Sequence, residues 1–177
     1  TFQESKKYTL KLLSNIFYRI GDQSILFSRL RTKLGVAYSP YTINSFYPQF
    51  GIFAFKVDVE PKNIEITLRE ISKIIKELKT KPLGNNLIKL AKSRAKFDVK
   101  EYLYNINPTR YFSYSNHVID NQPIVNPEIL YQEYYSKYNA GHIKKIANEV
   151  FQKNKCYLTL VGNNNLSDTK LRNLLDF

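Results

Sequence analysis

Methionine and tryptophan are absent from the 177 residues, and there is a single cysteine. One cysteine cannot form an internal disulfide, and because Cys156 stands in an apolar run, we expect a buried, structural thiol. No apolar run approaches the ~20 residues that span a bilayer, and no signal peptide is visible. Because the chain starts at Thr1 without an initiator methionine, we expect it to be part of a longer or processed polypeptide.

Histidine is also scarce, which limits the metal chemistry open to this chain. Its two histidines, His117 and His142, are far apart in the sequence. The stretch from His117 to Asn121 echoes H-x-x-E-H only in part, since it lacks the second histidine and has Asp120 in place of glutamate. A catalytic zinc usually takes three protein ligands, so we expect no metal site here. Phosphate-binding glycine loops, G-x-S-x-G elbows and C-x-x-C pairs are missing as well.

Apolar and basic residues, in contrast, are plentiful. Hydrophobic residues make up 43% of the chain, and its 14 tyrosines and 11 phenylalanines far exceed what a disordered segment contains. A chain of this length can bury a core of its own. The net charge of +12 could attract nucleic acid, an anionic membrane or acidic peptides. The lysines are spread over expected outer helix faces, which favours a solvated basic surface over a nucleic-acid site.

The apolar spacing predicts two helices, then two strands, then mostly helices. Gly35 is placed to end the second helix, and in the second strand Phe53, Phe55, Val57 and Val59 should share one buried face. Strands grouped before helices indicate an α+β fold, with a mixed or antiparallel sheet and helices packed on one side. The expected helices cover 12–20, 23–33, 61–80, 85–104, 107–117, a segment from 126 onward, 143–151 and a short segment at the end of the chain. The expected strands cover 36–44, 50–59 and 157–161, the last of them buried.

One segment carries a family resemblance. The residues Ser28 to Ser39, SRLRTKLGVAYS, resemble the pattern S-R-L-x-x-x-L-R-x-K-x-G-x-x-Y-S of the insulinase, pitrilysin and mitochondrial processing peptidase families, with a shorter gap before the second arginine. Supporting pieces are Val57 to Asn63, which resembles a strand-to-helix junction, Asn126-Pro127-Glu128, and the terminal Leu158 to Gly162. The resemblance spans nearly the whole chain and is to the non-catalytic, C-terminal-type domain of these inverzincin zinc metallopeptidases.

The resemblance implies a half-domain of a clamshell peptidase, of the LuxS/processing-peptidase-like type. Family members pair homologous α+β domains across a chamber, and one domain carries the zinc-binding H-x-x-E-H motif. This chain would be the opposite domain: a single non-catalytic unit over 1–177, inactive alone. Its partner would be the H-x-x-E-H domain or subunit, which would supply the zinc, and its ligand a peptide substrate. The family's first strand would be missing or lie upstream of Thr1.

The resemblance also implies two substrate-binding residues, Arg31 and Tyr38, which have the family's seven-residue spacing. An arginine can fork onto a peptide carbonyl or a carboxylate, and a tyrosine hydroxyl can donate to the oxyanion that develops at a scissile carbonyl. The alternative is purely structural: Arg31 as a charge at a helix C-terminus and Tyr38 as an aromatic residue of the sheet.

Three functions are therefore open. The first is the substrate-binding half of an active zinc metalloendopeptidase, closing the peptide chamber. The second is a catalytically inactive homologue that acts as a structural or assembly subunit. The third, a nucleic-acid or anionic-surface binder, depends on net charge alone and would show steep salt dependence.

Overall fold

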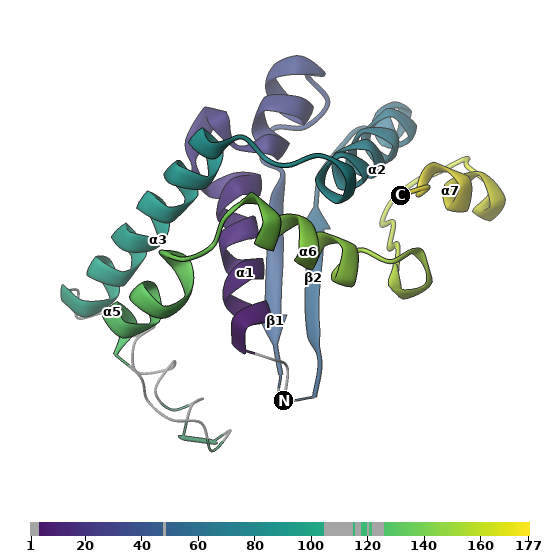
Figure 1. Ribbon diagram of the computed structural model, residues 1–177. Coiled ribbons are helices and arrows are strands. Elements are labelled where there is room, and N and C mark those ends of the chain that lie inside the picture. Colours follow the sequence, from purple (N-terminus) through teal and green to yellow (C-terminus); the bar gives the residue numbers. More distant parts are fainter. Residues whose placement is uncertain (1–3, 48, 105–114, 116–117, 120, 122–125) are drawn as a thin grey trace.

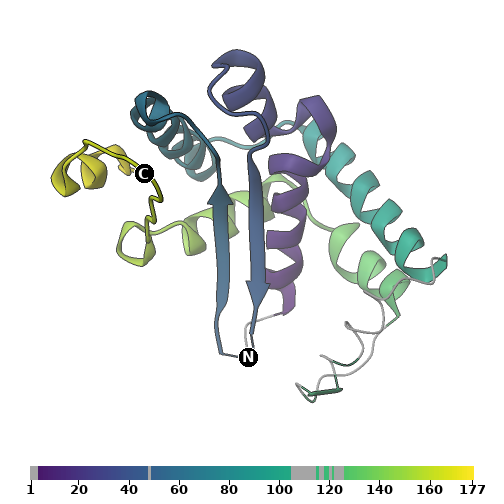
Figure 2. The ribbon, with the colours of Figure 1, turned by 180° about the vertical axis from the view of Figure 1, so that it is seen from behind.

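The computed structural model describes residues 4–47, 49–104, 115, 118–119, 121 and 126–177. Helices cover one side of a two-stranded antiparallel sheet (Figure 1), and the view from behind shows the two strands with no helix in front of them (Figure 2). The predicted α+β class, with helices on one side of an antiparallel sheet, is confirmed. Within the described residues, no helix combines the length and apolar character needed to cross a bilayer.

The sheet consists of β1 (Tyr41–Phe46) and β2 (Gly51–Lys56), in a register that pairs Tyr41 with Lys56. Because side chains alternate between faces, Phe53 and Phe55 point to the helices, and Val57 and Val59 continue that apolar face beyond the strand, as predicted. The prediction of a strand over 36–40 is wrong. Since Tyr41 already faces the last residue of β2, this segment has no neighbour with which to pair, and Pro40 has no N–H to donate.

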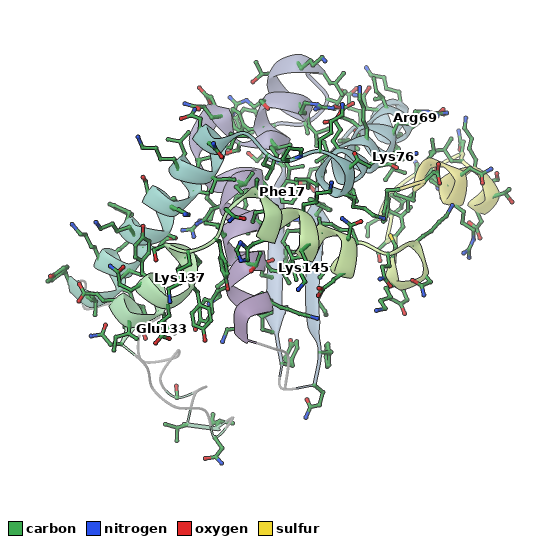
Figure 3. The ribbon with its side chains drawn as sticks, viewed as in Figure 1. Phe17, Arg69, Lys76, Glu133, Lys137 and Lys145 are labelled. Atoms are coloured by element: carbon green, nitrogen blue, oxygen red, sulfur yellow. The ribbon has the colours of Figure 1, made fainter. Side chains whose placement is uncertain are left out.

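The first helix forms the centre of the core. It begins as α1 (Glu4–Ser14) and continues into a π-helical stretch, η1 (Asn15–Arg19). Four of its residues are fully buried: Leu12, Leu13, Ile16 and Phe17. The Phe17 ring (labelled in Figure 3) packs on the rings of Phe53 and Phe55, with centroid distances of 5.8 and 4.9 Å. This contact fixes the sheet against the helical layer.

The remaining helices follow the predicted order. Pro61 opens the turn before α2. Asn126 caps α5 through a 2.8 Å bond from the Glu128 N–H, and α3 begins at Asn85, as expected. The predicted helix over 107–117 lies almost entirely outside the described residues, as does His117. The elements are η2 (Gly21–Gln23), η3 (Phe27–Lys33), η4 (Pro61–Asn63), α2 (Ile64–Thr80), α3 (Asn85–Tyr104), α5 (Pro127–Leu130), η5 (Tyr131–Tyr135), α6 (Ala140–Val150), η6 (Lys153–Lys155) and α7 (Asp168–Leu174).

The predicted buried strand over 157–161 is wrong for this chain. The segment is not paired as a strand, and Tyr157 and Val161 are 93% and 97% exposed. A strand needs a neighbour for its backbone groups, and a groove separates this segment from β2. Cys156 is likewise exposed rather than buried.

The basic side chains are distributed over several elements. Arg69 and Lys76 lie on α2, Lys137 follows η5 and Lys145 lies on α6 (Figure 3). This spread agrees with the interpretation of the +12 charge as a solvated surface.

Candidate functional site

The turn that joins η3 to β1 carries both predicted site residues. Gly35 adopts a φ of +63°, a left-handed conformation that glycine reaches without strain. The turn is closed by three backbone bonds, in which the N–H groups of Leu34, Gly35 and Val36 donate to the carbonyls of Arg29, Arg31 and Leu30 at 3.2, 3.0 and 2.9 Å. The prediction that Gly35 ends this helix is confirmed, and the reversal directs the chain back past Arg31.

Arg31 and Tyr38 are in direct contact. The Cζ atom of Arg31 lies 4.4 Å from the centroid of the Tyr38 ring and 4.3 Å from that of Phe27. Tyr38 is 74% exposed, whereas Ala37 before it is buried and anchors the segment. The guanidinium therefore bridges two rings, with Tyr38 on the solvent side. Sequence reasoning had missed Phe27, although its position four residues before Arg31 was a usable signal.

A second arginine in the same segment has a different environment. Arg29 donates from Nε to Glu70 and from a terminal nitrogen to Oε2 of Glu77 at 3.0 Å. Burial alone would lower the pKa of Arg29, but the bonds that it donates to Glu77 and Glu70 outweigh this effect and raise that pKa. The bond to Arg29 in turn lowers the pKa of Glu77. Arg29 thus ties η3 to α2 and holds the turn in place.

Arg31, in contrast, has its hydrogen-bonding groups available. No carboxylate of the described residues lies within ion-pairing distance of it, while the two rings contact its guanidinium. The N–H donors of a guanidinium point outward in its plane, so stacking leaves them free for a carbonyl or carboxylate. The Tyr38 ring is largely exposed, so its phenol is open to a ligand as well. The pair offers donors for an anionic or carbonyl oxygen.

The uncovered face of the sheet adjoins this turn. Ile43 on β1 and Ile52 on β2 are exposed on it, and Tyr41 begins β1 three residues after Tyr38. The Lys56 ammonium lies 5.5 Å from the centre of the Tyr41 ring. The uncovered face thus carries both apolar and polar side chains.

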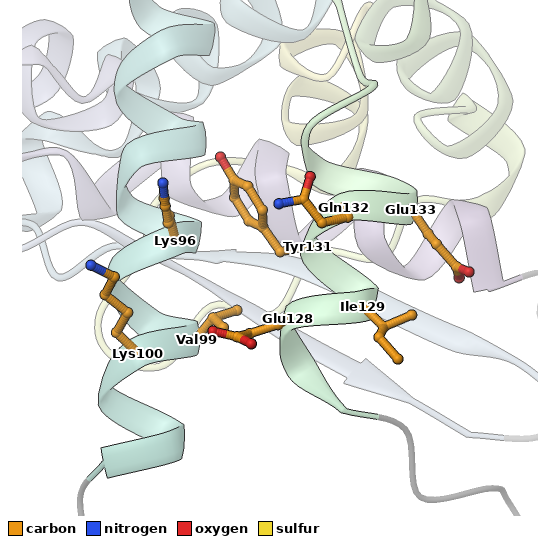
Figure 4. A pocket seen from close by; sticks show the side chains of 8 residues that line it. All are labelled: Lys96, Val99, Lys100, Glu128, Ile129, Tyr131, Gln132 and Glu133. Carbon is orange, nitrogen blue, oxygen red and sulfur yellow. The ribbon is translucent and has the colours of Figure 1, made fainter.

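A separate pocket of about 540 Å³ lies between α3 and the α5–η5 segment (Figure 4). Lys96 and Lys100 line one side and Glu128 and Glu133 the other, with Tyr131 between them. Its side chains carry both signs of charge, and it contains none of the predicted site residues. No role follows from its chemistry.

The metal-binding residue types do not converge. In the described parts of the chain, no three His, Cys, Asp or Glu side chains come together in a way that could hold a metal ion. His142 instead caps α6: its Nδ1 accepts from the Asn139 N–H at 3.3 Å.

The fold resembles that of the non-catalytic domains of insulinase-like peptidases, and the family comparison agrees. The family described as "Peptidase M16 inactive domain" matches residues 2–95, slightly more than half of the chain. The chain belongs to this family of non-catalytic peptidase domains, which confirms the resemblance found in the sequence.

Two solved structures have a similar fold. One is a protease from Helicobacter pylori, with 21% identity, a TM-score of 0.73 and coverage of 86% of this chain and 36% of that chain. The other is a conserved protein from Enterococcus faecalis, with 19% identity, a TM-score of 0.63 and coverage of 81% and 32%. The chain thus spans about a third of each of these relatives, and at such identities the likeness establishes the fold alone. No curated protein matches the sequence.

Proposed function

We propose that this chain is the substrate-binding half of an insulinase-like zinc metalloendopeptidase. In this function it closes a peptide chamber opposite a domain or subunit that carries the H-x-x-E-H motif. Membership of a non-catalytic peptidase family supports the proposal, as does the contact between Arg31 and Tyr38. That contact is the observation that carries it, because it brings two predicted substrate-binding residues together at the surface.

Arg31 would bind and orient the peptide. Stacking between Phe27 and Tyr38 holds the guanidinium in one orientation, so less side-chain freedom is lost when it binds a substrate carbonyl or carboxylate. A fixed fork of donors is suited to such an oxygen. Substrate would therefore meet a preorganised cation rather than a mobile one.

Tyr38 would act on the reacting carbonyl. Its phenol can donate a hydrogen bond to the oxygen of the scissile bond as that oxygen gains negative charge. The adjacent Arg31 guanidinium, 4.4 Å from the ring, adds a positive charge that favours the same oxyanion. The two residues would thus contribute to the transition state without performing proton transfer or nucleophilic attack.

The zinc of the proposed peptidase would belong to the partner domain. The described residues of this chain do not fit a zinc site, since no three suitable ligands meet. The zinc would supply its chemistry from the partner's H-x-x-E-H motif, and this chain alone would not cleave peptides.

The test is peptide cleavage by the polypeptide that contains both halves, or by the reconstituted pair. A mixed peptide library is digested by the unmodified protein and by the Arg31→Ala and Tyr38→Phe variants. Loss of one transition-state hydrogen bond should lower kcat about 10²–10³-fold. Lys33→Ala and Tyr104→Phe are matched controls, since both residues are exposed and neither contacts Arg31 or Tyr38 in the described structure.

The outcomes separate the candidate functions. Chelator-sensitive cleavage that falls in both site variants, but not in the controls, supports the substrate-binding half. Cleavage that is unchanged in both site variants contradicts the roles given to Arg31 and Tyr38. If the unmodified protein with zinc cleaves nothing in the library, the structural or assembly subunit becomes the better explanation.

A further inference from the structure

Two lysines of the first helix lie over one aromatic ring. The ammonium groups of Lys7 and Lys11 are 5.8 and 5.4 Å from the centroid of the Tyr8 ring. Tyr8 is buried, and its ring stacks on that of Tyr134 with a centroid distance of 4.6 Å. Because residues four apart are neighbours on a helix surface, the two ammonium groups lie on one face of α1, beside a ring that is held in place.

Neither ammonium group has a counter-charge in the part of the chain that the structure describes. Both side chains are partly buried, and neither forms an ion pair or a hydrogen bond with a described residue. The adjacent Lys6, in contrast, pairs with Glu149 at 2.8 Å. The face of a tyrosine ring attracts a cation but carries no net negative charge. Lys7 and Lys11 therefore form a cationic pair without an anion.

The pKa of Lys11 reflects this missing partner. Burial, with the nearby charge of Lys7 as the lesser cause, lowers the pKa of Lys11 to about 8. The ammonium group is still mostly protonated at neutral pH, so a positive charge is kept in a partly buried place. A buried cation without a partner is unfavourable, and an anion that binds beside it relieves this. The pair thus favours a negatively charged ligand.

This face of α1 follows the strand that leads away from the candidate site. The hydroxyl groups of Ser14, one turn after Lys11, and Thr42 of β1 share a hydrogen bond, and the rings of Tyr18 and Tyr41 are 6.2 Å apart. In both views α1 runs along β1 on the side away from β2, with its N-terminal end toward the hairpin (Figure 1, Figure 2). The lysine pair therefore lies farther along β1 than the contact between Tyr18 and Tyr41.

The length of this path sets the reach of a ligand. Extended chain from Tyr38 to Tyr41 spans at most about 10 Å, and the helical rise from Tyr18 back to Lys11 is about 10 Å. An extended peptide covers the sum of the two in about six residues. One peptide can thus contact Tyr38 and Lys11 together.

We propose that Lys7 and Lys11 bind the carboxylate of an acidic side chain in the peptide substrate and make the peptidase selective for acidic peptides. The inference rests on the proposed function, since it takes the peptide to lie at Arg31 and Tyr38. Each ammonium group has three N–H donors, and a carboxylate accepts from both groups at once. The acidic residue lies within about six residues of the bond that is cleaved.

Pairs of peptides that differ only by Glu or Gln at one position test this selectivity. The polypeptide with both halves, or the reconstituted pair, digests a set in which the changed residue moves through the roughly six positions on either side of the cleaved bond. At one position kcat/KM should be about 10–100-fold higher for Glu, the size of a charge-assisted hydrogen bond. Because the result is a ratio between two peptides, loss of folded protein does not affect it.

Three variants assign the selectivity to the lysine pair. Lys11→Gln should lower the preference for Glu by about 10-fold or more, whereas Lys11→Arg keeps the charge and should retain most of it. Lys89→Gln, at an exposed lysine of α3, is the matched control and should change nothing. Equal cleavage of Glu and Gln peptides by the unmodified protein, or an unchanged preference in Lys11→Gln, overturns the inference and leaves the roles of Arg31 and Tyr38 standing.

Binding without cleavage separates this inference from the proposed function. Fluorescent Glu and Gln peptides are titrated into the same protein with a chelator present, and the anisotropy is followed. Tighter binding of the Glu peptide that is lost in Lys11→Gln supports the carboxylate site, even if the zinc-loaded protein cleaves nothing and the proposed function fails. Equal binding of the two peptides overturns the inference.

Discussion

The two arginines of η3 should differ sharply in their effect on stability. Arg29 and Glu70 have side chains that are only 22% and 15% exposed, so replacing Arg29 leaves a nearly buried carboxylate without its partner. Breaking a fully buried pair costs about 3–5 kcal/mol, and the remaining exposure reduces this to roughly 2–3 kcal/mol. Glu77, at 36% exposed, adds little.

Replacing Arg31 should cost much less. A cation–π contact at an exposed site contributes about 0.5–1 kcal/mol, and a methionine in its place keeps contact with the Phe27 and Tyr38 rings. Arg31→Met should therefore lower the free energy of unfolding by less than about 1 kcal/mol. The same substitution at Arg29 should cost two to three times as much.

Urea unfolding followed by far-ultraviolet circular dichroism measures both effects, since the chain has no tryptophan to report by fluorescence. The double variant Arg29→Met/Glu70→Met provides the control, because removing both partners also removes the unpaired charge and should restore part of the loss. Equal costs at Arg29 and Arg31, or a double variant no more stable than Arg29→Met, would refute the assignment of one structural and one substrate-binding arginine.

Further predictions concern the turn at Gly35, the loss of stability at acid pH and the packing of the core. The Cβ atom that Gly35→Ala adds has no atom within 4 Å. The substitution should therefore lower the free energy of unfolding by about 1–2 kcal/mol through the left-handed backbone alone, and an unchanged melting temperature would contradict this. The bond from Arg29 lowers the pKa of Glu77 in the folded state. The contribution of this pair to stability is therefore present above the pKa of about 4.3 that Glu77 has in the unfolded chain, and it is lost as the pH falls through the folded-state pKa. Glu77→Gln should therefore show a shallower stability loss between pH 5 and roughly pH 3 in acid titrations, and an identical slope would argue against the pair. Phe17→Ala should cost about 3–5 kcal/mol in urea unfolding, with a loss under about 2 kcal/mol counting against its central packing.

Much of the fold was predictable because helices depend mainly on local pattern. The helix over 61–80, the helix that begins near Asn126 and the helix end at Gly35 were predicted correctly, and each is decided by residues within a turn or two. Strands depend on neighbours far along the chain. The misplaced start of β1 and the unpaired segment 157–161 both arise from this dependence.

The candidate site was predictable in part for the same reason. The spacing of Arg31 and Tyr38, together with the family resemblance, pointed to both residues, and the structure places them in contact; their substrate-binding role stays a prediction. Phe27 completes the stack from the preceding helical turn. The separation of roles between Arg29 and Arg31 depends on Glu70 and Glu77, which lie on another helix and follow no local pattern.

The sequence by itself determined the helices, the reversal at Gly35 and the family to which the chain belongs, because short-range spacing and one segment of specific residues encode them. Only the tertiary structure decided which arginine is tied to α2, which face of the sheet is uncovered, and that a groove flanks β2. These features depend on which segments become neighbours in space. The free energy of burial and pairing selects that arrangement, and spacing along the chain does not record it.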